Sequence, residues 1–122
     1  MCGIVGIFNY EKVNKKLMLS VSNKIKHRGP DSNDIYLEKK SNLGLASLRL
    51  AIVDASKQGN QPTHSFSNRF VMVYNGEIYN YLELRELIEK KSLKDKLKIL
   101  WKNSTDSEVL VNGIEIFGIK KM

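Results

Sequence analysis

The sequence predicts an α+β fold with antiparallel strands, and three observations support this class. A short apolar run, "GIVGIF", directly follows the only cysteine near the start of the chain. Two strand-like runs then follow each other between residues 34 and 54, which favours antiparallel pairing over a doubly wound parallel sheet. Apolar residues recur at helical spacing in two further segments, 13–26 and 81–91. A length of 122 residues fits one domain or part of one.

The start of the chain predicts a strand followed by a helix. Residues 3–8 form a short, apolar and β-branched run, which is typical of a buried strand. The helix is expected over residues 13–26. Its apolar residues stand four apart and share one face: Val13, Leu17, Val21 and Ile25.

A loop and a hairpin are expected next. Residues 27–34 contain Gly29 and Pro30, which favour a loop. The runs 34–40 and 42–54 are strand-like and are joined by the polar stretch "KKSN", which predicts a hairpin.

The second half of the chain predicts a loop, a strand and a helix. Residues 55–68 are rich in polar and turn-forming residues and are expected to be a loop. Residues 69–76 form the clearest strand pattern, which ends in Asn75-Gly76, a pair that favours positive φ. Residues 81–91 predict a helix. One side of it is expected to carry its apolar residues: Tyr81, Leu84, Leu87 and Ile88.

A last strand and a last helix complete the expected order. Residues 96–101 alternate between apolar and polar side chains, which predicts a strand. Thr105 precedes Glu108 by three residues, a spacing that predicts a capping box at the start of a helix.

The composition predicts a water-soluble domain in a reducing compartment. The net charge of +7 invites a nucleic-acid interpretation, but the lysines are scattered and favour a solvated surface. No apolar run reaches the roughly 20 residues of a membrane span, and the N-terminus lacks the pattern of a secretory signal. A single cysteine excludes an intramolecular disulfide, so a cytoplasmic location is expected, without nucleic acid or membrane as a partner.

Cys2 is the first candidate for chemistry. Most lone cysteines are small buried apolar residues, and this alternative remains open. Its position suggests another role, because removal of Met1 would leave a thiol and a free α-amine on one residue. Such an amine has a pKa of about 7.7–8.0 and can take the thiol proton, as in N-terminal nucleophiles.

Five other residues are candidates for function, and each position also has a structural alternative. Arg49 is either a surface arginine at a strand end or a residue whose guanidinium binds a substrate carboxylate. Asn75 and Gly76 form either a simple turn or an oxyanion hole for acyl transfer. Asp106 either stabilises a helix N-terminus or, together with Glu77, holds a substrate ammonium.

The histidines and glycines point to no metal or nucleotide site. Neither His27 nor His64 has the spacing of a metal ligand, so no metal is expected. No phosphate-binding or dinucleotide fingerprint occurs.

Six motifs occur in one order: "MCGIVGIF", "HRGPD", "RLAIVD", "QP", "NGEIYN" followed by "LR", and "TDSEV". In this order they resemble the N-terminal glutaminase domain of glutamine-hydrolysing asparagine synthetases, a class II glutamine amidotransferase. The resemblance covers nearly all of residues 1–110. It implies an N-terminal nucleophile hydrolase fold, with two antiparallel sheets between helical layers (αββα).

The resemblance also implies roles for individual residues. Cys2 resembles the catalytic N-terminal cysteine, and Asn75 with Gly76 resembles the oxyanion hole. Glu77 and Asp106 resemble the partners of the glutamine α-amino group. The glutamine α-carboxylate is expected to bind Arg49, with backbone of the same pocket supplied by Leu50, Ile52 and Val53.

The implied reaction is release of ammonia from L-glutamine through a Cys2 thioester, for asparagine biosynthesis. This step needs no cofactor, whereas ATP and Mg belong to the synthetase domain, which is absent from residues 1–122. We expect a partial domain, incomplete at its C-terminus, that works with a separate synthetase chain or a missing C-terminal portion. One departure is Ser47, where the family often has histidine. The alternative is an inactive remnant that acts at most as a binding or folding module.

Overall fold

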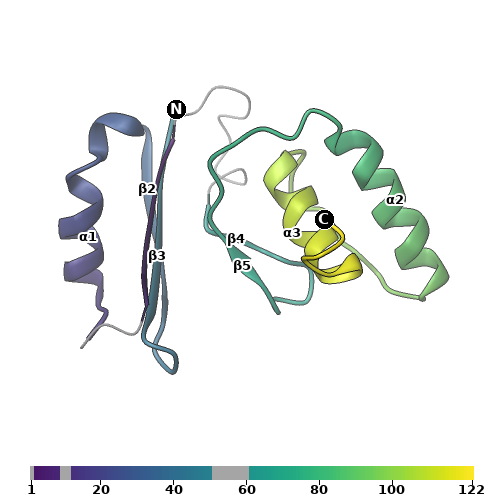
Figure 1. Ribbon diagram of the computed structural model, residues 1–122, viewed down its shortest axis with the longest axis horizontal. Helices are drawn as coiled ribbons and strands as arrows, with labels where there is room; N and C mark the ends of the chain where they lie inside the picture. Colours follow the sequence, from purple (N-terminus) through teal and green to yellow (C-terminus); the bar gives the residue numbers. More distant parts are fainter. Residues whose placement is uncertain (1, 9–11, 51–60) are drawn as a thin grey trace. The chain divides into compact units, whose positions relative to one another are not determined.

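The computed structural model describes residues 2–8, 12–50 and 61–122, and the chain divides into two compact units. The first unit comprises residues 1–62 together with 72–75, and the second comprises residues 63–71 and 76–122. Both units combine strands with helices (Figure 1). The predicted α+β class with antiparallel strands is therefore confirmed for the described residues.

The first unit is a three-stranded antiparallel sheet with a helix against it. The strands are β1 (Gly3–Phe8), β2 (Ser32–Glu38) and β3 (Leu43–Arg49), in the order β1-β3-β2. Helix α1 (Lys15–Asn23) runs along one face of this sheet (Figure 1). The hairpin between β2 and β3 confirms the prediction from "KKSN".

Helix α1 is shorter than the predicted range 13–26. The Asn14 side chain accepts a hydrogen bond from the Leu17 amide at 2.9 Å and caps the helix, so Val13 precedes it. At the other end, the amides of Lys24 and Ile25 bond to carbonyls three residues back. Such bonds tighten a last turn, and a 3₁₀ turn, η1 (Lys26–Arg28), follows.

The core of the first unit forms where α1 meets β3. Met18, Ala46 and Leu48 are fully buried. Met18 lies over Gly44, where an added Cβ would come within 2.5 Å of the Met18 sulfur. The absence of a side chain at Gly44 therefore lets the helix approach the sheet closely.

Replacing Met18 by alanine is expected to destabilise the first unit by about 2–5 kcal/mol, because it leaves a cavity between α1 and β3. Urea unfolding followed by circular dichroism measures the change. Leu19→Ala is the matched control, since Leu19 is on the same helix but 37% exposed. Equal unfolding midpoints for the two variants would contradict this assignment of the core.

Strand β1 forms over the predicted residues 3–8, but it is buried on one face only, which corrects the prediction of a buried strand. Ile4 and Phe8 are 44% and 70% exposed, whereas Gly3 is buried. The side chains of a strand alternate between faces, and α1 covers only one face of the sheet.

The second unit pairs two helices and contains most of a short two-stranded sheet, whose last residue, Met72, belongs to the first unit. Helix α2 (Tyr81–Lys94) packs against α3 (Asp106–Phe117), and β4 (Thr63–His64) pairs with β5 (Val71–Met72). Ile88, Val109 and Val111 form its buried apolar core. None of the described helices has the length and hydropathy needed to cross a membrane.

Of the two strands predicted in this half of the chain, one is shorter than predicted and the other does not form. The pattern over 69–76 becomes a strand only at Val71–Met72, and residues 96–101 form no strand. Lys96 adopts a positive φ of 57°, which interrupts extended backbone. Of the predicted loop 55–68, residues 55–60 lie outside the described residues and Thr63–His64 form β4.

Both helices of the second unit begin where the sequence predicts, with two differences in detail. On α2 the buried residues are Ile88 and Ser92, whereas Leu87, predicted on the same apolar side as Ile88, is 52% exposed. On α3 the Thr105 hydroxyl accepts a hydrogen bond from the Glu108 amide, as predicted. The Glu108 carboxylate does not complete the capping box but binds two other amides.

Candidate functional site

Cys2 lies directly before β1, at one end of the three-stranded sheet. The Leu50 amide donates a hydrogen bond to the Cys2 sulfur at 3.4 Å, and the sulfur is 3.9 Å from the Leu50 carbonyl oxygen. The thiol is free and partly exposed. A nucleophile must be held and accessible, and Cys2 meets both conditions.

Arg49 is brought next to Cys2 by the pairing of β1 with β3. Gly3 pairs with Leu48, so continuing the register by one residue places Cys2 opposite Arg49. The Arg49 carbonyl accepts a hydrogen bond from the Asp31 amide at 3.0 Å, which holds the end of β3 in place. Ile52 and Val53, which were predicted to supply backbone to the same glutamine pocket, lie outside the described residues.

The loop of the "HRGPD" motif packs onto the end of β3. An added Cβ on Gly29 would lie 2.3 Å from the Leu48 carbonyl group and 2.6 Å from the Arg49 nitrogen. Beside this contact is a shallow hollow of about 330 Å³ lined by His27, Arg28, Pro30 and Leu50. The sequence interpretation did not include the hollow, although the motif that forms it was visible.

Asn75, Gly76 and Glu77 follow β5 in an exposed segment. Gly76 lies at a bend, but neither Asn75 nor Gly76 has a positive φ. The expectation that this pair adopts positive φ was therefore wrong. The segment is an open bend and not a tight hairpin turn, which leaves its backbone accessible.

Asp106 is the first residue of α3 and contacts the chain next to Glu77. Its Oδ2 atom accepts a hydrogen bond from the Ile78 amide at 2.9 Å. The structure therefore brings Asp106 together with the Glu77-Ile78 segment. Within the described part of the chain, its other carboxylate oxygen makes no hydrogen bond and can accept one.

The candidate residues are divided between the two units. Cys2, Arg49, Leu50 and Asn75 belong to the first unit, and Gly76, Glu77 and Asp106 belong to the second. The first group contains a thiol and a guanidinium. The second contains two carboxylates, which carry the charge that would attract an ammonium group.

Neither histidine contributes to a metal site in the described residues. No three histidine, cysteine or acidic side chains lie close enough there to hold a metal ion. Burial lowers the pKa of His64 below its usual value, and the charge of Lys102 lowers it further.

Comparison with known proteins decides the family. The chain matches the glutamine amidotransferase domain over residues 1–122. It belongs to this family. Membership agrees with the free thiol at the start of β1 and with the order of motifs in the sequence.

Several curated relatives are named as asparagine synthetases. The chain is 38% identical to the putative asparagine synthetase [glutamine-hydrolyzing] 2 of Methanocaldococcus jannaschii, over 91% of this chain and 23% of the relative. It is 34% identical to asparagine synthetase [glutamine-hydrolyzing] 1 of Bacillus subtilis, over 91% of this chain and 17% of the relative. Amidase chry2 of Gibberella zeae is 33% identical, over 78% of this chain and 13% of the relative. This glutamine amidotransferase domain thus spans less than a quarter of these relatives.

Proposed function

We propose that this glutamine amidotransferase domain hydrolyses L-glutamine and supplies the ammonia for asparagine synthesis. The family match over residues 1–122 carries the proposal. It is supported by the partly exposed Cys2 thiol, which lies beside Arg49 in the register of β1 and β3. Asparagine is the favoured product because relatives from an archaeon and a bacterium are named as asparagine synthetases.

Cys2 acts as the nucleophile once Met1 has been removed. The free α-amine accepts the thiol proton, and the sulfur forms a bond to the side-chain amide carbon of glutamine. The C–N bond then breaks, and the amine returns the proton so that ammonia leaves. Water attacks the thioester, the C–S bond breaks, and glutamate and the thiol are released. The amide of Leu50, which donates to the sulfur, orients the side chain for attack.

The other residues bind glutamine or stabilise the reaction. The planar guanidinium of Arg49 binds the α-carboxylate, with backbone from Leu50, Ile52 and Val53 lining the same pocket. The Asn75 amide and the Gly76 N–H donate to the oxyanion that forms on the attacked carbonyl.

Glu77 and Asp106 hold the α-ammonium group of glutamine. Because Ile78 already occupies Oδ2 of Asp106, the second carboxylate oxygen of Asp106 is the one that accepts from the ammonium.

The proposal includes the αββα arrangement of N-terminal nucleophile hydrolases and a synthetase partner. Glutamine hydrolysis by these residues needs no cofactor. ATP and Mg serve the activation of aspartate, which we assign to a synthetase portion on the same chain or on a separate one. The share of each relative that this chain leaves uncovered is long enough to hold such a portion.

The test is covalent labelling by an electrophilic glutamine analogue, followed by peptide mass spectrometry. The natural protein, with Met1 removed and confirmed by intact mass, is expected to be labelled on Cys2 and to release ammonia from glutamine. Excess glutamine should slow the labelling, because both molecules compete for one site.

A second candidate is an inactive binding or folding module of the same family. Ser47, which is buried with 4% exposure, stands where the family often has histidine and favours this alternative. A processed protein that stays unlabelled and shows no glutamine-dependent rise in melting temperature would establish the inactive alternative.

A further inference from the structure

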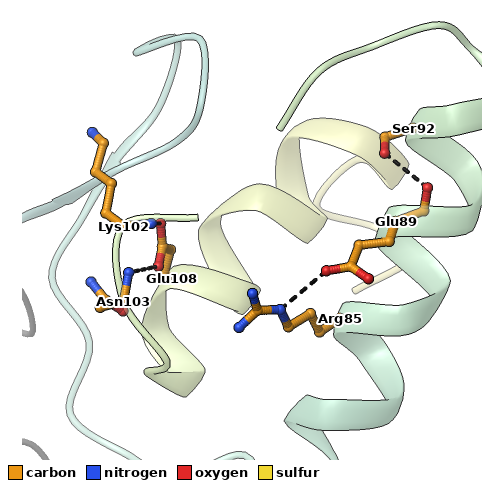
Figure 2. A network of polar contacts seen from close by, with 6 residues as sticks. All are labelled: Arg85, Glu89, Ser92, Lys102, Asn103 and Glu108. Atoms are coloured by element: carbon orange, nitrogen blue, oxygen red, sulfur yellow. Dashed lines mark hydrogen bonds and ion pairs between the residues drawn. The ribbon is translucent and has the colours of Figure 1, made fainter. Parts of the chain in front are cut away.

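Glu108 is a buried carboxylate that organises the loop before α3. It is only 2% exposed. One carboxylate oxygen accepts a hydrogen bond from the Lys102 amide at 2.7 Å, and the other accepts from the Asn103 amide at 2.8 Å (Figure 2). Hydrogen bonds to a charged acceptor are stronger than neutral ones, and both carboxylate oxygens are used here. Glu108 therefore closes the loop of residues 102–105 against the first turn of α3.

The same loop is joined to α3 by a second set of bonds. The Asn103 side-chain oxygen accepts from the Thr105 amide at 2.9 Å and from the Thr105 hydroxyl at 2.6 Å. The Thr105 hydroxyl in turn caps α3 by accepting from the Glu108 amide. Residues 102–108 thus form one closed polar network that leaves the start of α3 little freedom.

The loop is also held from the side of α2. The Arg85 guanidinium lies over the Trp101 ring at 4.4 Å from its centroid, immediately before the loop. Arg85 itself is oriented by Glu89 at 3.2 Å (Figure 2). Trp101, which directly precedes the two residues whose amides bond to Glu108, is therefore held in place as well.

Asp106 lies within residues 102–108 and connects them to the Glu77-Ile78 segment. Asp106 follows Thr105 directly, and its Oδ2 atom accepts from the Ile78 amide. The direction of the Asp106 side chain therefore depends on the backbone that Glu108 holds. The Glu77-Ile78 segment depends on Asp106 in turn.

We propose that Glu108 is a positioning residue for the site that binds the α-ammonium group of glutamine. It acts through the loop of residues 102–105, which sets Asp106 and thereby Glu77. The inference rests on the proposed function, because it assigns that site to Glu77 and Asp106. Glu108 itself is too buried to touch the substrate.

The kinetic test replaces Glu108 by glutamine in the natural protein with Met1 removed. A glutamine side chain has one oxygen that accepts and one NH₂ group that donates. It can therefore accept from only one of the two loop amides, and its NH₂ group faces the N–H of the other. The KM for glutamine is expected to rise on the order of tenfold, because one charge-assisted hydrogen bond no longer orders the loop. The kcat should stay within about threefold, and Cys2 alkylation by iodoacetamide, which needs no ammonium site, should be unchanged.

Two control variants separate positioning from loss of stability. Glu86→Gln removes a carboxylate on α2 that is 71% exposed, pairs with Lys90 and contacts neither Arg85 nor the loop, and it should leave the KM unchanged. Val111→Ala opens a cavity in the core of α3 and lowers the melting temperature, but it keeps the loop bonds. A Glu108→Gln protein that matches Val111→Ala, with a lower melting temperature and an unchanged KM, would overturn the proposal.

Hydrogen exchange at the Ile78 amide tests the positioning independently of catalysis. Exchange at this amide should be faster in Glu108→Gln than in the parent and the Glu86→Gln control. If the parent protein hydrolyses no glutamine, the proposed function fails, while faster exchange still supports control of the Glu77-Ile78 segment by Glu108. Unchanged exchange at Ile78 would overturn that control whatever the activity of the parent.

Discussion

Replacing Cys2 by alanine is expected to reduce glutamine hydrolysis by at least about a thousandfold, because the proposed mechanism loses its nucleophile. The backbone around the site should stay in place. Cys2 precedes β1, and its only side-chain hydrogen bonds in the described residues are with Leu50. Ammonia release from glutamine measures the effect, and an unchanged melting temperature shows that folding is preserved.

A second variant separates the contribution of the thiol to hydrolysis from that of the α-amine. One extra residue that cannot be removed, placed before Cys2, keeps the thiol but converts the amine to an amide. The loss of hydrolysis is expected to be about a hundredfold to ten thousandfold, which is the usual contribution of a general base. Full activity of this extended protein would show that Cys2 does not use its own amine.

Replacing Gly29 by alanine is expected to destabilise the first unit by about 3 kcal/mol, because the new Cβ overlaps backbone atoms. It would lie 2.3 Å from the carbonyl carbon and oxygen of Leu48, a distance that real Cβ atoms essentially never show. Both atoms belong to a central strand, which is hydrogen-bonded on both sides, so they have little room to shift. A urea unfolding curve measures the change in the free energy of unfolding.

Gly6→Ala is the matched control for this substitution. A Cβ on Gly6 would lie 3.6 Å from a Leu45 methyl group, which is an ordinary contact. Its unfolding midpoint should therefore stay close to that of the parent. If the two alanine variants unfolded at the same urea concentration, the close packing of the "HRGPD" loop on β3 would be wrong. In the proposed enzyme, Gly29→Ala should also weaken glutamine binding, because the strand that the loop contacts ends at Arg49.

Local patterns predicted the elements that depend on neighbouring residues. The hairpin of β2 and β3 needed only two β-branched or apolar runs and a polar turn between them. The start of α3 needed only Thr105, whose hydroxyl satisfies a free amide of the first turn. Both signals act over a few residues, and their hydrogen-bond partners lie nearby in the sequence.

The failed predictions concern features that depend on a partner. Residues 96–101 alternate as a strand does, but alternation makes a strand only where another strand can bond to it. In the structure, the amides of Lys96 and Leu97 bond back to carbonyls at the end of α2, and the Arg85 side chain lies over Trp101. Leu87 has an apolar side chain like Ile88, yet only Ile88 faces α3, where its Cδ1 atom would lie 3.3 Å from a Cβ added at Gly113.

The sequence by itself predicted the family and the candidate residues, because Cys2, Arg49, Glu77 and Asp106 are identified by residue type and by the order of their motifs. The tertiary structure alone decided the contacts between distant segments. It placed the Leu50 amide on the Cys2 sulfur and the Ile78 amide on Asp106. The physical reason is that a side chain's chemistry is a local property. Its hydrogen-bond partner depends on how segments up to 48 residues apart in the sequence pack together.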